Sequence, residues 1–210
     1  MLAASAPLPM PDLLVLYYSR NGSVRALAES IASGIDSVAG SQARLRTVPP
    51  VAAITQTAAP PVPASGAPYV EKRDLAECIG VALGSPTRFG NMAAPMKHFW
   101  DTTGAEWQNG TLIGKPACVF TSSTSQHGGQ ESTLLTMMVP LLHHGMLIVG
   151  LPYSEPALAS TTGGGGPYGA SHVANHQGNA ATGAALTDDE MQLARALGKR
   201  LAVTALKLAQ

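Results

Sequence analysis

The sequence predicts an α/β fold in which a doubly wound parallel sheet of five strands carries helices on both faces. Five short runs are apolar at nearly every position, as is typical of strands that are covered on both sides. These runs alternate with segments whose apolar residues recur at helical spacing. In such sheets ligands bind beyond the carboxyl ends of the strands, so the loops that follow strands one, three and four are the most informative.

Composition limits the function classes. The 210 residues suit one compact domain that spans the whole chain, 1–210. Thirteen Lys and Arg balance thirteen Asp and Glu, and a zero formal net charge argues against a nucleic-acid partner, which normally selects a basic surface. A hydrophobic content of 45% argues against a disordered chain. We therefore expect a globular protein that does not bind nucleic acid.

The cysteines and the N-terminus indicate the compartment. Cys78 and Cys118 lie in apolar runs, which favours reduced core thiols over a redox pair. No apolar run approaches the roughly 18 residues that cross a bilayer. Residues 1–11 form a flexible Pro/Ala leader without the positive charge of a signal peptide. We expect a cytoplasmic protein that does not associate with membranes.

The first half of the domain is expected to contain two strands and one helix. The strands are Leu13–Tyr18 and the shorter Ala43–Val48. The helix between them has one apolar face, formed by Val24, Leu27, Ala28, Ile31, Ala32 and Ile35. Residues 49–69 are rich in Pro and Ala and show no period, so we expect a long surface loop within the domain.

Three more strands are expected in the remainder, at Cys78–Gly84, Pro116–Ser122 and Met146–Pro152. A helix ending near Gly104 follows the first of them, and Trp107 is expected in the loop beyond it. The apolar face of that helix is formed by Met92, Met96, Phe99 and Trp100.

Two helices complete the domain. The first contains Pro140, which should kink it, and ends at Gly145. A glycine-rich loop, Gly163–Ala170, precedes the last helix, which opens with a capping box at Thr187–Glu190. The last helix is expected to turn four leucines inward: Leu193, Leu197, Leu201 and Leu208.

The loop after the first strand favours an anion site. Ser19–Ser23 runs directly into a helix, whose first amides and dipole attract a phosphate, and Gly22 allows close approach. The loop has no G-x-G-x-x-G and no Walker lysine motif, which argues against a dinucleotide held in the Rossmann manner and against NTP hydrolysis. A monophosphate bound without a metal fits best, although a merely polar turn has the same composition.

The loops after the third and fourth strands could contact a heterocycle. In residues 85–91, Arg88 could pair with a phosphate or a polar ring edge, while Phe89 could pack under a flat ring; an ordinary turn is the alternative. Residues 121–130 are rich in hydroxyl and amide groups. His143 and His144 end a helix, where an imidazole is also favoured by the dipole, and their adjacency argues against a shared metal.

Taken in order, LVLYYSRNGSV, GSPTRFGNM, FTSSTSQHGGQE, LLHHGMLIVG and GGGGPYGA resemble the WrbA family of flavodoxin-like NAD(P)H:quinone oxidoreductases. The resemblance spans roughly residues 12–208. It implies a flavodoxin-like fold, bound FMN and NADH or NADPH as co-substrate. It also implies a homotetramer whose active sites are built partly by neighbouring subunits, and a ping-pong, two-electron reduction of quinones.

The resemblance also implies site residues. Trp107 would border the substrate cavity, and His144 would reach the flavin site and could assist proton delivery. Asn21 stands where the family usually has a tyrosine near the nicotinamide, and Thr124 replaces a common glycine, which leaves the preferred nicotinamide open. The FMN-binding set would be Ser19, Arg20, Asn21, Gly22, Ser23, Val24, Pro86, Thr87, Arg88, Phe89, Ser122, Ser123, Thr124, Ser125, Gln126, Gly128, Gly129 and His144.

Two other functions remain possible at this point. A one-electron flavodoxin carrier would have the same fold, although such carriers tend to be acidic and this chain is neutral. A regulatory repressor-binding protein is suggested by the family's name, as a tryptophan-repressor-binding protein, but the chain offers no DNA-reading element.

Overall fold

The computed structural model describes residues 11–51, 63, 65–174 and 185–209. The leader 1–11, except its last residue, and most of the loop 49–69 therefore lie outside the described residues. The described strands form one parallel sheet in the order β2-β1-β3-β4, with β5 and β6 both paired to β4. The strands are β1 (Asp12–Tyr17), β2 (Gln42–Thr47), β3 (Gly80–Pro86), β4 (Pro116–Ser123), β5 (Leu147–Ile148) and β6 (Ala170–Val173).

The edge of the sheet next to β4 differs from the expected single strand at Met146–Pro152. β5 pairs only with Pro116–Ala117, and β6 continues the same edge by pairing with Phe120–Ser123. The chain leaves β4 after Val149, and Leu151 donates its backbone N–H to the carbonyl of Pro167 at 2.9 Å instead. Val149 and Leu151 are both buried, but only Val149 still bonds to β4, through its backbone N–H to the Ala117 carbonyl at 2.7 Å.

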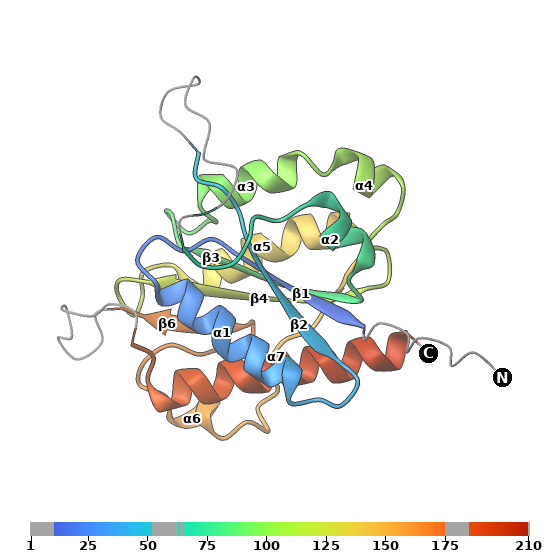
Figure 1. The fold of residues 1–210 in the computed structure, drawn as a ribbon. Helices are drawn as coiled ribbons and strands as arrows, with labels where there is room; N and C mark the ends of the chain where they lie inside the picture. Colours follow the sequence, from blue (N-terminus) through green and yellow to red (C-terminus); the bar gives the residue numbers. More distant parts are fainter. Residues whose placement is uncertain (1–10, 52–62, 64, 175–184, 210) are drawn as a thin grey trace.

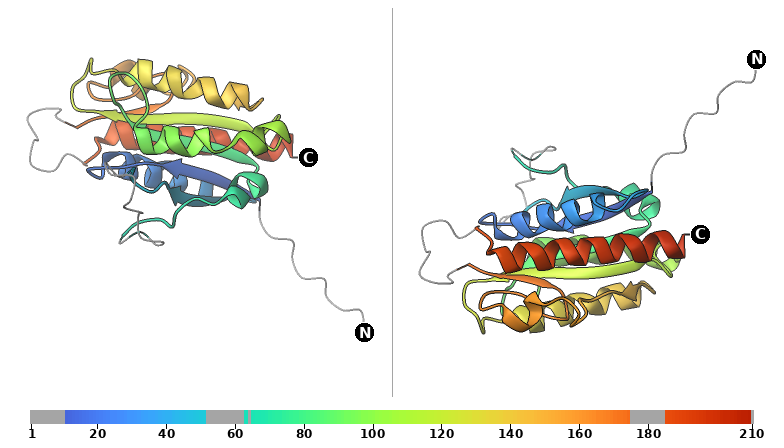
Figure 2. Two further views of the ribbon diagram at one scale, coloured as in Figure 1. Left: turned by 90° about the horizontal axis from the view of Figure 1, so that it is seen from above. Right: turned by 90° about the horizontal axis from the view of Figure 1, so that it is seen from below.

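Helices cover both faces of the sheet, as expected (Figure 1). One face carries α1 (Ser23–Asp36) and α7 (Asp188–Leu208), and the other carries α3 (Ala94–Asp101) and α5 (Gln130–His143). Figure 2 shows the two faces in turn: α3 and α5 lie in front of the strands in the view from above, and α1 and α7 lie in front of them in the view from below. Three short helices were not anticipated: α2 (Lys72–Glu77), α4 (Gly104–Gln108) and α6 (Ala157–Ser160). Trp107 therefore lies in α4 and not in a loop.

The contact between α1 and α7 depends on two glycines. A Cβ at Gly34 would collide with the carbonyl of Arg195, and one at Gly198 would collide with the carbonyl of Ile31. All six residues of the predicted apolar face of α1 are buried. The capping box of α7 is confirmed by reciprocal hydrogen bonds between Thr187 and Glu190.

The expectation for the end of α7 is wrong. Leu193, Leu197 and Leu201 are fully buried, whereas Leu208 is 52% exposed. The physical reason is length: α7 has 21 residues and α1 has 14, so the last turns of α7 extend beyond their partner helix. Cys78 and Cys118 are buried free thiols, and burial raises the pKa of both.

Candidate functional site

A cleft of about 260 Å³ opens where the carboxyl ends of β1, β3 and β4 meet. This is the edge at which open α/β sheets bind ligands. The loops after these strands supply its lining, together with one residue that follows β6. The lining residues are Ser19, Arg20, Asn21, Ser23, Val24, Pro86, Thr87, Arg88, Ser122, Ser123, Thr124 and Ala174. The structure thus brings together eleven residues of the expected FMN-binding set.

The first loop is shaped for an anion. Gly22 caps α1 in the left-handed conformation, with φ of 92°, and no side chain caps the start of this helix. The backbone N–H of Gly22 donates to Ser19 Oγ at 3.2 Å, which tightens the turn. Arg20 and Arg88 are the charged residues of the cleft lining, and no carboxylate of the described residues joins them there. The cleft is therefore electropositive.

The second loop is a two-residue turn between Arg88 and Asn91. Their backbones exchange hydrogen bonds of 2.7 and 3.0 Å, and both intervening residues have positive φ, 52° at Phe89 and 77° at Gly90. This is the pattern of a type I′ turn, in which a bulky residue is strained. The turn leaves the Phe89 side chain fully exposed, and Arg88 Nη1 donates to the Thr87 carbonyl at 2.7 Å.

The third loop borders two pockets. The Ser122 carbonyl, near the end of β4, accepts the backbone N–H of Thr87 at 2.9 Å, which ties the loop after β3 to the end of β4. Gln126 and Gly129 line a neighbouring pocket of about 560 Å³, whose opposite wall is the glycine-rich segment 163–166. Gln126 Nε2 donates across it to the Thr162 carbonyl at 3.2 Å. Of the expected set, Gly22, Phe89, Ser125, Gln126, Gly128 and Gly129 flank the cleft without lining it.

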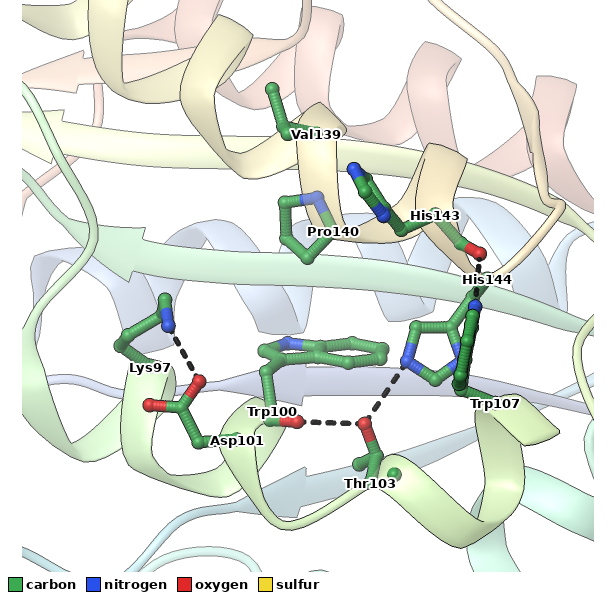
Figure 3. Close-up of a pocket in the computed structure, with 10 residues that line it drawn as sticks. Lys97, Trp100, Asp101, Thr103, Trp107, Val139, Pro140, His143 and His144 are labelled. Carbon is green, nitrogen blue, oxygen red and sulfur yellow. Dashed lines mark hydrogen bonds and ion pairs between the residues drawn. The ribbon is translucent and has the colours of Figure 1, made fainter.

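The two remaining site residues lie elsewhere in the chain. His144 and Trp107 line a second pocket, of about 420 Å³, at the C-terminal end of α5 (Figure 3). The cleft lies at the N-terminal end of the same helix, and a helix of 14 residues is about 20 Å long. Within one chain, His144 therefore does not reach the cleft, contrary to the simplest form of the expectation.

The hydrogen bonds of the second pocket fix the proton on His144. Thr103 Oγ1 donates its single proton to the Trp100 carbonyl at 2.7 Å, so it accepts from His144 Nε2 at 3.0 Å. His144 Nδ1 and Trp100 Nε1 are both buried, and neither has a hydrogen-bond partner among the described residues. Burial lowers the pKa of His144, which keeps its ring neutral. The pocket is thus lined by a neutral imidazole whose Nδ1 lone pair is buried and has no partner among the described residues.

Trp107 forms the outer wall of this pocket. Its side chain is 56% exposed, yet its Nε1 donates to the carbonyl of His143 at 2.8 Å, which links α4 to the end of α5. Trp100 packs edge-on against the His144 ring at 5.2 Å between centroids. In Figure 3 the His144 imidazole lies between the two indoles. An exposed, oriented tryptophan beside a neutral histidine is suited to a flat, polar-edged ligand.

The described residues offer neither a metal site nor a membrane span. They contain no group of three or more His, Cys, Asp or Glu side chains placed to hold a metal ion. They also contain no helix that is both long and apolar enough to cross a membrane.

Comparison with known proteins identifies the family. The family model described as NADPH-dependent FMN reductase matches residues 13–159. An NAD(P)H dehydrogenase (quinone) of Chromohalobacter salexigens is 43% identical over 204 residues, which cover 95% of this chain and all of the relative. A protein of the same description from Geotalea daltonii is 44% identical and covers 93% of this chain and 97% of its own. This chain belongs to the family of NAD(P)H dehydrogenases (quinone).

Solved structures confirm the flavodoxin-like fold of this family member. A WrbA-like flavodoxin from Agrobacterium tumefaciens superposes with a TM-score of 0.65 at 20% identity and covers 94% of this chain and 98% of its own. Oxidised flavodoxin 1 from Bacillus cereus gives a TM-score of 0.59 at 16% identity, over 91% and 97% of the two chains. The resemblance to the WrbA family that the motifs indicated is thereby confirmed.

The cleft fits FMN. A helix start without a side-chain cap, two arginines and no lining carboxylate suit a phosphate monoester. Hydroxyl groups of the loops after β3 and β4 suit the polar edge of a flavin ring. Sequence reasoning missed Ala174, because the four-residue strand β6 that delivers it was not recognised. It also missed Thr103 and Trp100 as partners of His144, because a Thr–His contact across 41 residues leaves no signal in a single sequence.

Proposed function

We propose that this protein is an FMN-dependent NAD(P)H dehydrogenase that reduces quinones by two electrons. The observation that carries the proposal is the electropositive cleft at the carboxyl ends of β1, β3 and β4, in a chain that belongs to the quinone dehydrogenase family. Bound there, FMN would take the electron pair of NADH or NADPH and give it to a quinone.

The cleft residues bind and orient the cofactor. Residues 19–24 hold the phosphate with the uncapped helix start and the Ser19 and Ser23 side chains. Arg88 lines the cleft and would lie at the edge of the bound ring, where its positive charge would favour electron density on the ring and thus its reduction. Phe89 is held fully exposed by a turn in which its backbone is strained. Backbone strain of this kind is typical of binding sites, which supports a contact between Phe89 and the bound ring.

The second pocket completes the active site of another copy. The outer face of α5 carries an exposed apolar stripe at Leu135, Val139 and Leu142. Contiguous exposed apolar side chains indicate a protein–protein interface, so we infer that another chain packs on this face. If α5 packs antiparallel on its copy about a twofold axis, the C-terminal end of each helix meets the N-terminal end of the other. Each cleft then faces the His144 and Trp107 of a neighbour. This arrangement supports the homotetramer, which contains such twofold pairs.

In the assembled site, Trp107 would stack on the substrate and exclude water from the cleft. His144 Nδ1 is the unpartnered ring nitrogen, and it would exchange a proton with the substrate oxygen while Thr103 holds Nε2. Because the imidazole is neutral, Nδ1 would first take up a proton from solvent and then deliver it to the substrate oxygen, which returns the ring to its neutral form. The free thiols Cys78 and Cys118 support a cytoplasmic location, where thiols stay reduced.

The test is a visible absorbance titration of the purified protein with FMN, followed by NADH and then benzoquinone. The proposal predicts that protein-bound flavin bands bleach with NADH and return with benzoquinone. Absence of flavin binding in excess FMN would contradict it. Bleaching by NADH without recovery on adding the quinone would contradict the assigned electron acceptor.

A further inference from the structure

A hydroxyl is buried in the first turn of helix α5. Thr133 is fully buried, and an unpartnered hydroxyl in such a place is costly. Its Oγ1 donates to Thr87 Oγ1 at 2.7 Å, and Thr87 lines the cleft. The two residues are 46 positions apart in sequence, so this bond joins the first turn of α5 to the loop after β3.

This bond sets the direction in which Thr87 can donate. A hydroxyl carries one proton, and Thr87 Oγ1 uses a lone pair to accept from Thr133, so its own proton is directed elsewhere. Among the described residues, Thr87 Oγ1 makes no other hydrogen bond. The remaining direction is the cleft, and the Thr87 hydroxyl is therefore a donor available to a ligand acceptor.

Two further contacts hold Thr87 in this position. Its backbone N–H donates to the Ser122 carbonyl at 2.9 Å, which fixes the main chain. Gly129, the left-handed cap of α5, leaves room for the hydroxyl, since a Cβ there would lie 3.3 Å from Thr87 Oγ1 and 3.3 Å from Gly90 Cα. Backbone, glycine and Thr133 together leave the hydroxyl little freedom to rotate.

We propose that Thr133 is a positioning residue, which fixes the Thr87 hydroxyl as a hydrogen-bond donor to an acceptor atom on the heterocycle in the cleft. The acceptor is a carbonyl oxygen or an unprotonated ring nitrogen, both of which a flavin ring offers. The inference deepens the proposed function and rests on it. It assigns the contact to the ring and not to the phosphate, which is held by the first loop.

The experiment compares dissociation constants of FMN and riboflavin, measured by quenching of flavin fluorescence. Thr133→Val keeps the shape and removes the donor, and it should weaken both ligands by the same factor, about three- to tenfold. Riboflavin has no phosphate, so an equal loss places the contact on the ring. Thr133→Ser should restore affinity to within about twofold, and Thr204→Val, on the opposite layer of helices, serves as the control.

A double-mutant cycle makes the test specific. In a Thr87→Val background, Thr133→Val should have no further effect on affinity, because the hydroxyl that it orients is gone. The inference is overturned if Thr133→Val binds both flavins like wild type, if its loss persists in the Thr87→Val background, or if Thr133→Ser fails to restore binding. A wild-type protein that binds no flavin would instead overturn the proposed function itself.

Discussion

The two ends of α5 carry two pockets of opposite character. At its N-terminal end the cleft is electropositive, polar and built from loops that follow strands, so it is suited to a phosphorylated cofactor. At its C-terminal end the pocket is lined by two tryptophans and a neutral histidine, so it is suited to a flat neutral substrate. Neither pocket alone contains both a cofactor site and a proton-exchanging group. The comparison suggests that one catalytic site needs both ends, supplied by different copies of the chain.

The largest expected effect is on the cofactor end. Gly22→Asp forces an aspartate into a left-handed position and places a negative charge beside the phosphate site. FMN should bind at least about 100-fold more weakly, because a carboxylate near a phosphate repels it strongly at short range. Riboflavin, which lacks the phosphate, should lose much less, and Gly22→Ala isolates the backbone contribution. Equal losses for FMN and riboflavin would contradict the assignment of this loop to the phosphate.

At the substrate end, His144→Ala should leave FMN affinity within about twofold of wild type. Quinone turnover should fall by about 100-fold, the usual contribution of a positioned proton-exchanging group. His98→Ala, at an exposed histidine of α3, is the matched control and should leave both FMN affinity and quinone turnover unchanged. Stopped-flow measurement of the oxidative half-reaction gives the relevant rate. A loss of less than a few-fold would remove His144 from the mechanism.

The link between the two ends can be broken without touching either. Leu135→Lys places a charge in the exposed apolar stripe of α5, at a position that lines neither pocket, and should dissociate the oligomer, as measured by sedimentation. The dissociated chain should still bind FMN, while quinone reduction falls by about tenfold or more. Thr204→Lys, on α7, should leave assembly intact. Full quinone activity in a dissociated monomer would contradict completion of the site by a neighbour.

The smallest effect concerns pH. Burial lowers the pKa of His144, so the folded protein keeps the ring neutral at a pH where the unfolded chain already takes up a proton. The free energy of unfolding is therefore unaffected by His144 above the ordinary histidine pKa, about 6.5. It declines as the pH falls below that value, because only the unfolded chain gains the proton. Chemical denaturation between pH 5 and 8 should show this decline, and His144→Ala should remove part of it. An NMR resonance of His144 that titrates with a pKa above the ordinary histidine value would contradict the neutral ring.

The same comparison shows what the sequence could predict. The place of the cleft follows from local signals, because each of its loops directly follows an apolar strand run, and eleven of its twelve lining residues belong to the set that the family resemblance implied. The exception, Ala174, follows β6, which is too short and too far from β5 in sequence to be recognised as part of the same sheet edge.

The second pocket could not be assembled from the sequence in this way. Trp107 and His144 were identified only through the family resemblance, and Thr103 and Trp100, which orient His144, not at all. Their contacts depend on how α3 and α4 pack against the end of α5, which is tertiary information. Their separation from the cleft likewise depends on the length and direction of α5, and the motif order does not reveal it.

Complementation between two inactive variants tests the central claim most directly. Gly22→Asp disables the cleft and His144→Ala disables the second pocket, so each homo-oligomer should have little quinone reductase activity. When the two chains are dissociated, mixed in equal amounts and reassembled, half of the twofold pairs are mixed, and each mixed pair contains one intact site built from two chains. The account predicts recovery of about one quarter of wild-type activity. No recovery in demonstrably mixed oligomers would contradict it, because a site contained within one chain cannot be rescued by a partner.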